Sequence, residues 1–157
     1  MVANKFDEET FFRAVAACGA RAILIGRRAL VALGIPVGTL DYDFWVHIDD
    51  AALFNRPIEA MGFVASRTPD EARQTGRYVL EGGERIDVLV ARSMPMVTGG
   101  RLSFDEVWER RQLLAYTPGV TVAIPQLDDL ISTKRFAARA KDLADVELLL
   151  ALKAKQS

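Results

Sequence analysis

The sequence predicts an α+β fold, in which helices flank a mixed β-sheet and a helical segment follows at the C-terminus. Short apolar runs alternate with longer segments whose apolar residues recur at helical spacing. Half of the 157 residues are hydrophobic, which is enough for a core of ordinary size. We therefore expect a single domain, with no disordered tract and no internal repeat.

The first part of the chain predicts two helices and two strands in alternation. Asp7 is a good N-cap for a helix that runs to about Cys18. Residues 22–25 are a short apolar run typical of a strand, and residues 27–33 are helical in composition. After a loop with proline and glycine, residues 40–47 have the aromatic and β-branched content of a second strand.

The next segment predicts a helix and a weak strand. The helix covers residues 51–61, and either Asp49 or Asp50 can cap it. Pro57 lies inside this helix, so we expect the helix to be kinked or split there. Residues 63–67 predict a weak strand.

The middle of the chain predicts a β-hairpin followed by a short helix. Residues 68–76 are polar, and we expect them to be mobile. Residues 77–80 and 85–90 flank a glycine-containing turn, which is typical of a hairpin. Ser103 begins a capping-box pattern ahead of a helix that runs to about Arg111.

The end of the chain predicts one more strand and then helices only. The strand covers residues 120–124, and the pattern from 126 to 155 is helical, with a break near 139–142. We expect residues 1–124 to form the α/β core and residues 125–157 to be a helical segment packed on it, as a single compact unit.

Composition excludes several classes of protein. The formal net charge is −1 and the pI is about 5.9, so no overall basic excess is available to follow a long nucleic-acid backbone. The single cysteine, Cys18, rules out an internal disulfide and a cysteine zinc cluster. The N-terminus lacks the apolar stretch of a signal peptide, and no apolar run reaches the length of a membrane span. We expect a soluble cytoplasmic protein without a membrane partner.

The most informative motif is the pair Asp41 and Asp43, near the start of the second predicted strand. Side chains alternate between the two faces of a strand, so these two carboxylates point the same way. Two like charges at this spacing repel, which favours a hard cation such as Mg²⁺ or a basic side chain between them. The alternative is a solvated entry to the strand.

A third carboxylate, Asp87, stands alone in the apolar run of residues 86–90. An ionised carboxylate buried in such a strand is costly unless it is paired or bound to a metal. It is therefore either a metal ligand or the partner of an arginine such as Arg77 or Arg85. If its strand neighbours the strand of Asp41 and Asp43, the three carboxylates converge on one Mg²⁺ site.

The order of an apolar strand ending in glycine, a short helix, a loop with proline and threonine, Asp-x-Asp and a distal aspartate resembles the nucleotidyltransferase superfamily, of the minimal or bacterial toxin–antitoxin type. The resemblance spans most of the chain and implies a nucleotidyltransferase-like fold. It implies an enzyme that moves a nucleoside monophosphate from an NTP to an acceptor, which could be a protein, a tRNA end or a small molecule. A cognate partner protein is a further implication.

The resemblance also implies roles for individual residues. The three aspartates, Asp41, Asp43 and Asp87, would be the catalytic carboxylates and would bind Mg²⁺, as one ion or two. The expected nucleotide-binding residues come from the glycine turn, the following helix, the loop and the C-terminal helices, and they are Gly26, Arg27, Arg28, Thr39 and Lys134.

Two features of the chain leave alternatives open. Arg27 stands where the superfamily has a small residue, so it would either obstruct the phosphates or bind them with its guanidinium. If it obstructs them, the chain is a catalytically degenerate fold that binds a nucleotide or a partner. Lys134 and Lys141 could share a helix face and point toward a triphosphate, or form a solvated basic face.

Overall fold

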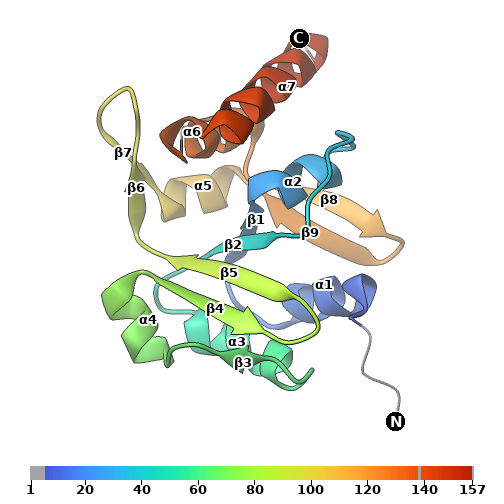
Figure 1. Cartoon of the computed structure of the whole chain (residues 1–157), viewed down its shortest axis with the longest axis vertical. Coiled ribbons are helices and arrows are strands. Elements are labelled where there is room, and N and C mark those ends of the chain that lie inside the picture. The colour runs from blue at the N-terminus through green and yellow to red at the C-terminus, as the bar shows by residue number, and fades with distance from the viewer. Residues whose placement is uncertain (1–5, 138, 157) are drawn as a thin grey trace.

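The computed structural model describes residues 6–137 and 139–156. A five-stranded mixed sheet forms its centre, with the strand order β1-β2-β5-β4-β3 (Figure 1). The strands are β1 (Ala22–Ile25), β2 (Tyr42–Val46), β3 (Val64–Ala65), β4 (Arg77–Glu81) and β5 (Arg85–Val90). Strands β2 and β5 are parallel, and every other neighbouring pair in this sheet is antiparallel.

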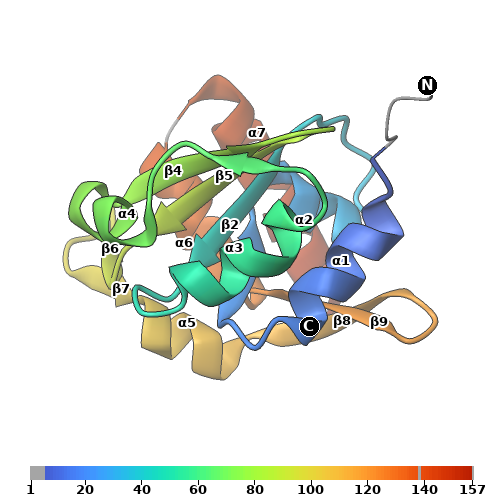
Figure 2. The same ribbon diagram turned by 90° about the horizontal axis from the view of Figure 1, so that it is seen from below.

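Helices cover the sheet from both sides. Helices α6 and α7 lie above it in Figure 1 and helices α1 and α3 below it, and the view in Figure 2 agrees. The helices are α1 (Glu8–Ala17), α2 (Gly26–Ala32), α3 (Ala51–Glu59), α4 (Pro69–Thr75), α5 (Phe104–Arg110), α6 (Leu127–Ala137) and α7 (Ala140–Gln156). Two separate hairpins are β6 (Ser93–Pro95) with β7 (Arg101–Ser103), and β8 (Gln112–Thr117) with β9 (Val120–Ile124). The predicted α+β fold is confirmed.

The two faces of the sheet differ because side chains alternate along each strand. On one face, Leu24, Phe44 and Val88 belong to the main apolar core together with aromatic and aliphatic residues of α1 and α3. On the other face, Trp45 packs against Phe104 of α5 in a smaller apolar cluster. This second face also carries the odd-numbered residues of β2 and β5, and the small cluster covers only part of it.

The C-terminal helices are part of the main core. Leu130 and Ile131 of α6 and Val146 and Leu149 of α7 are buried in the same cluster as the sheet residues. The C-terminal helical segment is divided into α6 and α7 close to the predicted position. The division into residues 1–124 and 125–157 stays a prediction. No helix within the described residues has the length and apolar character that a membrane span requires.

Several local predictions are confirmed by the hydrogen bonds that the structure shows. The Asp7 carboxylate accepts from the backbone N–H of Glu9 at 3.2 Å and caps α1. The Ser103 hydroxyl accepts from the backbone N–H of Glu106 at 3.1 Å and caps α5. These contacts satisfy donors in the first turn of each helix that have no partner within the helix.

The expectation of a mobile polar segment at residues 68–76 is wrong, because α4 forms there. The Thr68 hydroxyl accepts from the backbone N–H of Glu71 at 3.2 Å, and the Glu71 carboxylate accepts from the backbone N–H of Thr68 at 2.8 Å. Pro69 occupies the first turn, where its missing N–H costs nothing. Gly76 ends the helix with φ of 82°. The capping box was readable in the sequence.

Helix α3 is not split at Pro57, and the side chain of its N-cap residue does not cap it. Pro57 does not split it, because the residue lies in the last turn, where one missing backbone hydrogen bond is tolerated. Asp50 is the N-cap residue, but its side chain makes no capping hydrogen bond. Instead, its carboxylate accepts from the backbone N–H and Nε of Arg21, both at 2.8 Å. This ion pair ties the start of β1 to the start of α3.

Candidate active site

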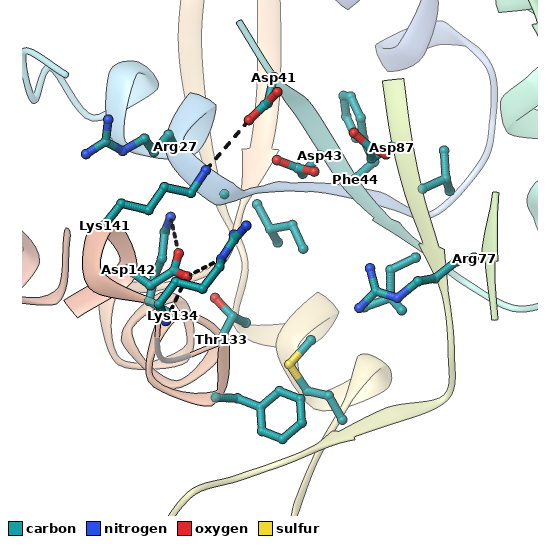
Figure 3. A pocket seen from close by; sticks show the side chains of 17 residues that line it. Arg27, Asp41, Asp43, Phe44, Arg77, Asp87, Thr133, Lys134, Lys141 and Asp142 are labelled. Atoms are coloured by element: carbon teal, nitrogen blue, oxygen red, sulfur yellow. Dashed lines mark hydrogen bonds and ion pairs between the residues drawn. The ribbon is translucent and has the colours of Figure 1, made fainter. Parts of the chain in front are cut away.

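A cavity of about 360 Å³ opens on the second face of the sheet, between the sheet and helices α2, α6 and α7 (Figure 3). The turn between β1 and α2 contributes Gly26 and Arg27 to its lining. Strands β2, β4 and β5 contribute acidic, apolar and basic side chains, and α6, α7 and the residue before α7 contribute the cations Lys134, Lys141 and Arg139 among other side chains. Its polar lining makes the cavity the candidate active site.

The parallel pairing of β2 and β5 brings the carboxylates together. Asp43 and Asp87 are direct partners in the register of these strands, so their side chains leave the same face of the sheet side by side. Asp41 precedes β2 and also lines the cavity. The predicted neighbourhood of the two strands is confirmed. Within the described residues, however, no three acidic, histidine or cysteine side chains form a group arranged to hold one metal ion. The carboxylates share a cavity but not a ready-made metal cluster.

Asp87 is less buried than the sequence indicated. Its side chain is 35% exposed, and Arg85, two residues earlier on the same face, lies 3.3 Å from its carboxylate. Of the two arginines considered as partners, Arg85 therefore makes the contact. The expectation of an isolated buried charge is wrong, because the second face of the sheet is open at this point.

The charged form of the Asp43 carboxyl group is strongly disfavoured in the cavity. Burial first, and then the charges of Asp87 and Asp41, raise the pKa of its carboxyl group from 3.8 to about 6, against the opposing effect of Lys134 and Lys141. Like charges at close range and partial desolvation both disfavour the ionised form. A cation at this position would relieve both effects.

Gly26 makes room for the Asp43 carboxylate. Its φ is 69°, in the left-handed region that side chains rarely adopt. A Cβ atom built at this position would lie 2.6 Å from Oδ2 of Asp43. The turn that was expected to hold phosphates thus also accommodates the Asp43 carboxylate. Only glycine allows both this backbone angle and the close approach of the carboxylate to position 26.

We expect Gly26→Ala to lower the free energy of unfolding by about 2–3 kcal/mol, through backbone strain and displacement of Asp43. Gly34→Ala is the matched control: its φ is 87°, but no atom lies within 4 Å of an added Cβ. The control should lose only about 1 kcal/mol, from the backbone strain alone. Urea unfolding followed by circular dichroism measures both values. Equal losses would show that the approach of Asp43 to Gly26 has no energetic weight.

Arg27 lines the cavity, but its donors are already engaged. Its Nε lies 3.1 Å and 3.2 Å from the two carboxylate oxygens of Asp145, and its Nη2 donates to the same carboxylate at 3.1 Å. Its Nη1 donates to the carbonyl oxygen of Gly38 at 3.1 Å. The guanidinium therefore bonds to α7 and to the loop before β2 in the described conformation.

Arg28 and Thr39 do not line the cavity. The Arg28 guanidinium stacks over the ring of Tyr42, 4.1 Å from its centroid, and donates to the carbonyl oxygens of Thr39 and Asp41. The Thr39 hydroxyl accepts from the backbone N–H of Asp41 at 3.0 Å. Both residues hold the backbone that presents Asp41, and their predicted contact with a nucleotide stays a prediction.

Lys134 is buried in an ion-pair network that the sequence did not reveal. Its Nζ donates to Asp145 at 2.8 Å and to Asp142 at 3.3 Å. Arg139 donates to Asp142 at 2.8 Å. Burial raises the pKa of Asp145, but the hydrogen bonds from Arg27 and Lys134 outweigh it and hold the pKa below its usual value. The acidic residues are fully buried in this network, which joins α2, α6 and α7.

The expectation that Lys134 and Lys141 share one helix face is wrong, because they lie on α6 and α7. Lys134 is buried, so it does not belong to a solvated basic face either. Lys141 is half-exposed, and its Nζ lies 3.9 Å from the Asp41 carboxylate (Figure 3). Both lysines nevertheless line the same cavity.

Several lining residues were not selected from the sequence. Their positions depend on how distant elements pack, and they are Arg77, Leu89, Met94, Thr133, Phe136 and Arg139. For Arg77 and Leu89 there was a signal, because strand alternation and the β4–β5 hairpin place both on the same face as Asp87. The others come from positions outside the central sheet, which sequence periodicity does not connect with it.

No protein-family model matches this sequence, and no curated protein matches it at a significant level. Solved structures do match its fold, and two examples follow. The Thermotoga maritima protein TM1012, whose crystal structure carries a provisional description as a nucleotidyltransferase, has a TM-score of 0.57 and 13% identity, over 93% of this chain and 88% of that one. The antibiotic-resistance factor ANT(2″)-Ia, solved in solution, has a TM-score of 0.63 and 15% identity, over 93% of this chain and 82% of that one. The chain therefore has the nucleotidyltransferase-like fold that its sequence predicts.

Proposed function

We propose that this protein is a nucleotidyltransferase that moves a nucleoside monophosphate from an NTP to an acceptor hydroxyl with the help of Mg²⁺. The pairing of β2 with β5, which sets Asp43 beside Asp87 in a cavity bordered by cationic side chains, carries the proposal. Carboxylates suit a hard cation, and cations suit a triphosphate. The fold shared with TM1012 supports the same reaction class.

The carboxylates fit Mg²⁺ in their chemistry. Asp41, Asp43 and Asp87 would hold the metal. Burial, together with repulsion from Asp87 and Asp41, raises the pKa of Asp43 to about 6, and a divalent cation would offset both effects. One or two bound ions would neutralise charge on the transferred phosphate and on the leaving pyrophosphate. Asp87, half-buried beside Asp43, is the proposed base for the acceptor hydroxyl.

The cations divide the work of holding the triphosphate. Lys141 is half-exposed and, among the described residues, makes only a long contact with Asp41, so it can turn toward a phosphate at little cost. Lys134 is fixed by Asp142 and Asp145 and contributes a positive charge at a set position. Arg27 contributes a positive charge at the turn between β1 and α2, while its Nε and Nη2 donate to the Asp145 carboxylate. A protein side chain, a tRNA end and a small hydroxylated molecule remain the candidate acceptors, and a cognate partner in a cytoplasmic toxin–antitoxin pair remains part of the proposal.

The second candidate function is a catalytically degenerate nucleotidyltransferase fold that binds a nucleotide or a partner protein. The engagement of the Arg27 guanidinium by Asp145 favours it, because the turn then offers the phosphates a bulky side chain with few free donors. Binding of an NTP without release of pyrophosphate would distinguish this function from catalysis.

Isothermal titration with each of the four NTPs tests the proposal. We expect binding that requires Mg²⁺, and release of pyrophosphate when an acceptor is supplied. Asp87→Asn should weaken Mg²⁺-dependent binding at least about tenfold, because it removes a charged ligand but keeps the shape of the side chain. Asp70→Asn on α4 is the control, since Asp70 is exposed, pairs with Arg73 and lies outside the cavity, and the affinity of this variant should equal that of the wild type. Metal-independent binding, or equal affinity in all three proteins, would refute the assignment of the carboxylates.

A further inference from the structure

The cavity wall across from the lysines is apolar and basic. Arg77, the first residue of β4, is the direct partner of Leu89 in the antiparallel pair with β5, so both side chains leave the same face of the sheet. Leu89 follows Asp87 by two residues and therefore shares that face as well. In Figure 3 the Arg77 guanidinium points into the cavity from the side opposite to Lys141.

Arg77 differs from the other lining cations in its partners. Arg27, Lys134 and Arg139 are bonded to Asp142 or Asp145, and Lys141 faces Asp41. Within residues 6–137 and 139–156, the Arg77 side chain makes no hydrogen bond or ion pair, whereas its backbone carbonyl oxygen accepts from Arg67 and Thr75. Its guanidinium is thus open to a ligand in the cavity.

Each described carboxylate that lines the cavity has either a proposed role in metal binding or a cationic partner. Asp41, Asp43 and Asp87 are the proposed metal ligands, and Asp142 is buried and bonded to Lys134 and Arg139. Among the described lining residues, no carboxylate remains for the ammonium groups of a polycationic acceptor. The wall beyond Asp87 instead offers a guanidinium beside apolar side chains.

The direction of transfer assigns this wall to the acceptor, on the basis of the function proposed above. In phosphoryl transfer the attacking and leaving oxygens lie roughly in line through the phosphorus. The lysine side favours the pyrophosphate, so the acceptor approaches from the side of Arg77. Its oxygen forms the new bond to the α-phosphorus, the bond to pyrophosphate breaks, and the hydroxyl proton passes to Asp87.

We propose that Arg77 binds the acceptor, and that the acceptor is a hydroxyl compound carrying a phosphate close to the reacting hydroxyl. A guanidinium matches a phosphate with two parallel hydrogen bonds, which fixes the distance between the phosphate and the hydroxyl. The same chemistry occurs at the 3′ end of a nucleic acid and in a small sugar phosphate. An amino sugar with several ammonium groups lacks it and would be repelled by Arg77.

Calorimetric titration of the protein, saturated with Mg²⁺ and a non-hydrolysable NTP analogue, tests this proposal. The probes are a short oligoribonucleotide with a free 3′ hydroxyl, ribose 5-phosphate and an amino sugar with several ammonium groups. We expect one of the phosphate probes to bind and the amino sugar not to bind. The oligoribonucleotide and the sugar phosphate separate the two sources of the phosphate. Binding of the amino sugar, or of none of the probes, would overturn the proposal.

Variants tie the binding to Arg77. Arg77→Ala should weaken the phosphate probe about tenfold or more, while the affinity for the NTP analogue changes less than about twofold. Arg77→Lys should restore part of the loss, because it keeps the charge without the fork. Arg73→Ala on α4 is the control, as Arg73 is exposed, pairs with Asp70 and lies outside the cavity. Equal weakening in the Arg77→Ala and Arg73→Ala variants would overturn the role of Arg77. If the NTP analogue fails to bind, the proposed function fails; if it binds and the phosphate probes do not, only the acceptor proposal fails.

Discussion

Asp145→Asn is expected to lower the free energy of unfolding by about 3 kcal/mol, the largest loss from any single isosteric change in this protein. Asp145 is fully buried and is the shared partner of Arg27 and Lys134, at 3.1 Å and 2.8 Å. Removing its charge leaves the two cations without their common counter-ion, in surroundings that water does not reach freely. Urea unfolding of the wild type and the variant at pH 7 measures the difference.

Asp128→Asn is the control for this experiment. Asp128 also pairs with a lysine, Lys153, at 2.6 Å, but its side chain is 60% exposed. An exposed ion pair contributes at most about 1 kcal/mol, so this variant should be close to the wild type. If both variants lose the same amount, the buried network does not stabilise the packing of α7 on the rest of the fold.

The pH dependence of the Asp145→Asn difference has a definite sign. The pKa of Asp145 is lowered in the folded protein, so its carboxylate contributes stability above its unfolded pKa, near the ordinary value of 3.8. That contribution is lost as the pH falls below 3.8 and through the folded pKa. The advantage of the wild type should therefore be constant from pH 5 to 8 and shrink only in more acidic solution. A difference that peaks near neutral pH would point to another group.

The network also shows why part of the site was beyond sequence reasoning. Arg27 was selected from its place in the glycine turn, but its partner lies 118 residues later, on the last helix. No local pattern connects two residues at that separation. Asp142 and Asp145 are three residues apart on a helix face that is otherwise apolar, and this was the one available sign that they need buried cations.

The strands and the carboxylates, in contrast, followed from local rules. Alternation along each strand places Asp43 and Asp87 on the face opposite to the main core, and a parallel pairing of their strands makes them neighbours. The polar composition of residues 68–76 outweighed the capping box at Thr68, which is why helix α4 was missed. The hairpin β6–β7 and the strand β8 were not expected, because strands of three residues and a strand without a clear apolar alternation give little signal in the sequence.

The second large effect concerns the stability difference between the wild type and Asp43→Asn, which should change sign when Mg²⁺ and a nucleotide bind. In the absence of Mg²⁺ and nucleotide, Asp43→Asn is expected to stabilise the protein at pH 8 by about 1–2 kcal/mol. The pKa of Asp43 is raised from 3.8 to about 6, mainly by burial and then by the charges of Asp87 and Asp41. Ionising this group at pH 8 therefore costs free energy in the folded state that it does not cost in the unfolded chain. The full shift corresponds to about 3 kcal/mol, and the partial exposure of the side chain reduces it.

The sign with pH follows from the same shift. Between about pH 4 and pH 6 the folded protein binds the proton of Asp43 more tightly than the unfolded chain does, so wild-type stability falls as the pH rises through this range. Asparagine does not titrate, so the stabilisation by Asp43→Asn should be small at pH 4 and complete by pH 7. Unfolding midpoints across this range measure it, with Asp70→Asn as the exposed control outside the cavity. Equal curves for the wild type and Asp43→Asn would show that the carboxylate is not under electrostatic stress.

Adding Mg²⁺ and an NTP analogue should invert the order. A ligand that binds only the folded state stabilises it by about 2.7 kcal/mol at a hundredfold excess over its Kd, and this gain requires the Asp43 charge. The wild type should then become the more stable protein at pH 8, while Asp43→Asn shows no gain. Asp43→Asn could be the more stable protein without metal, as expected, and yet gain as much as the wild type from Mg²⁺ and the analogue. In that case the unfavourable charge of Asp43 is unrelated to metal binding. The burial and the repulsion that make the charged form of Asp43 unfavourable in the folded protein are then also what makes Asp43 a strong ligand for a cation.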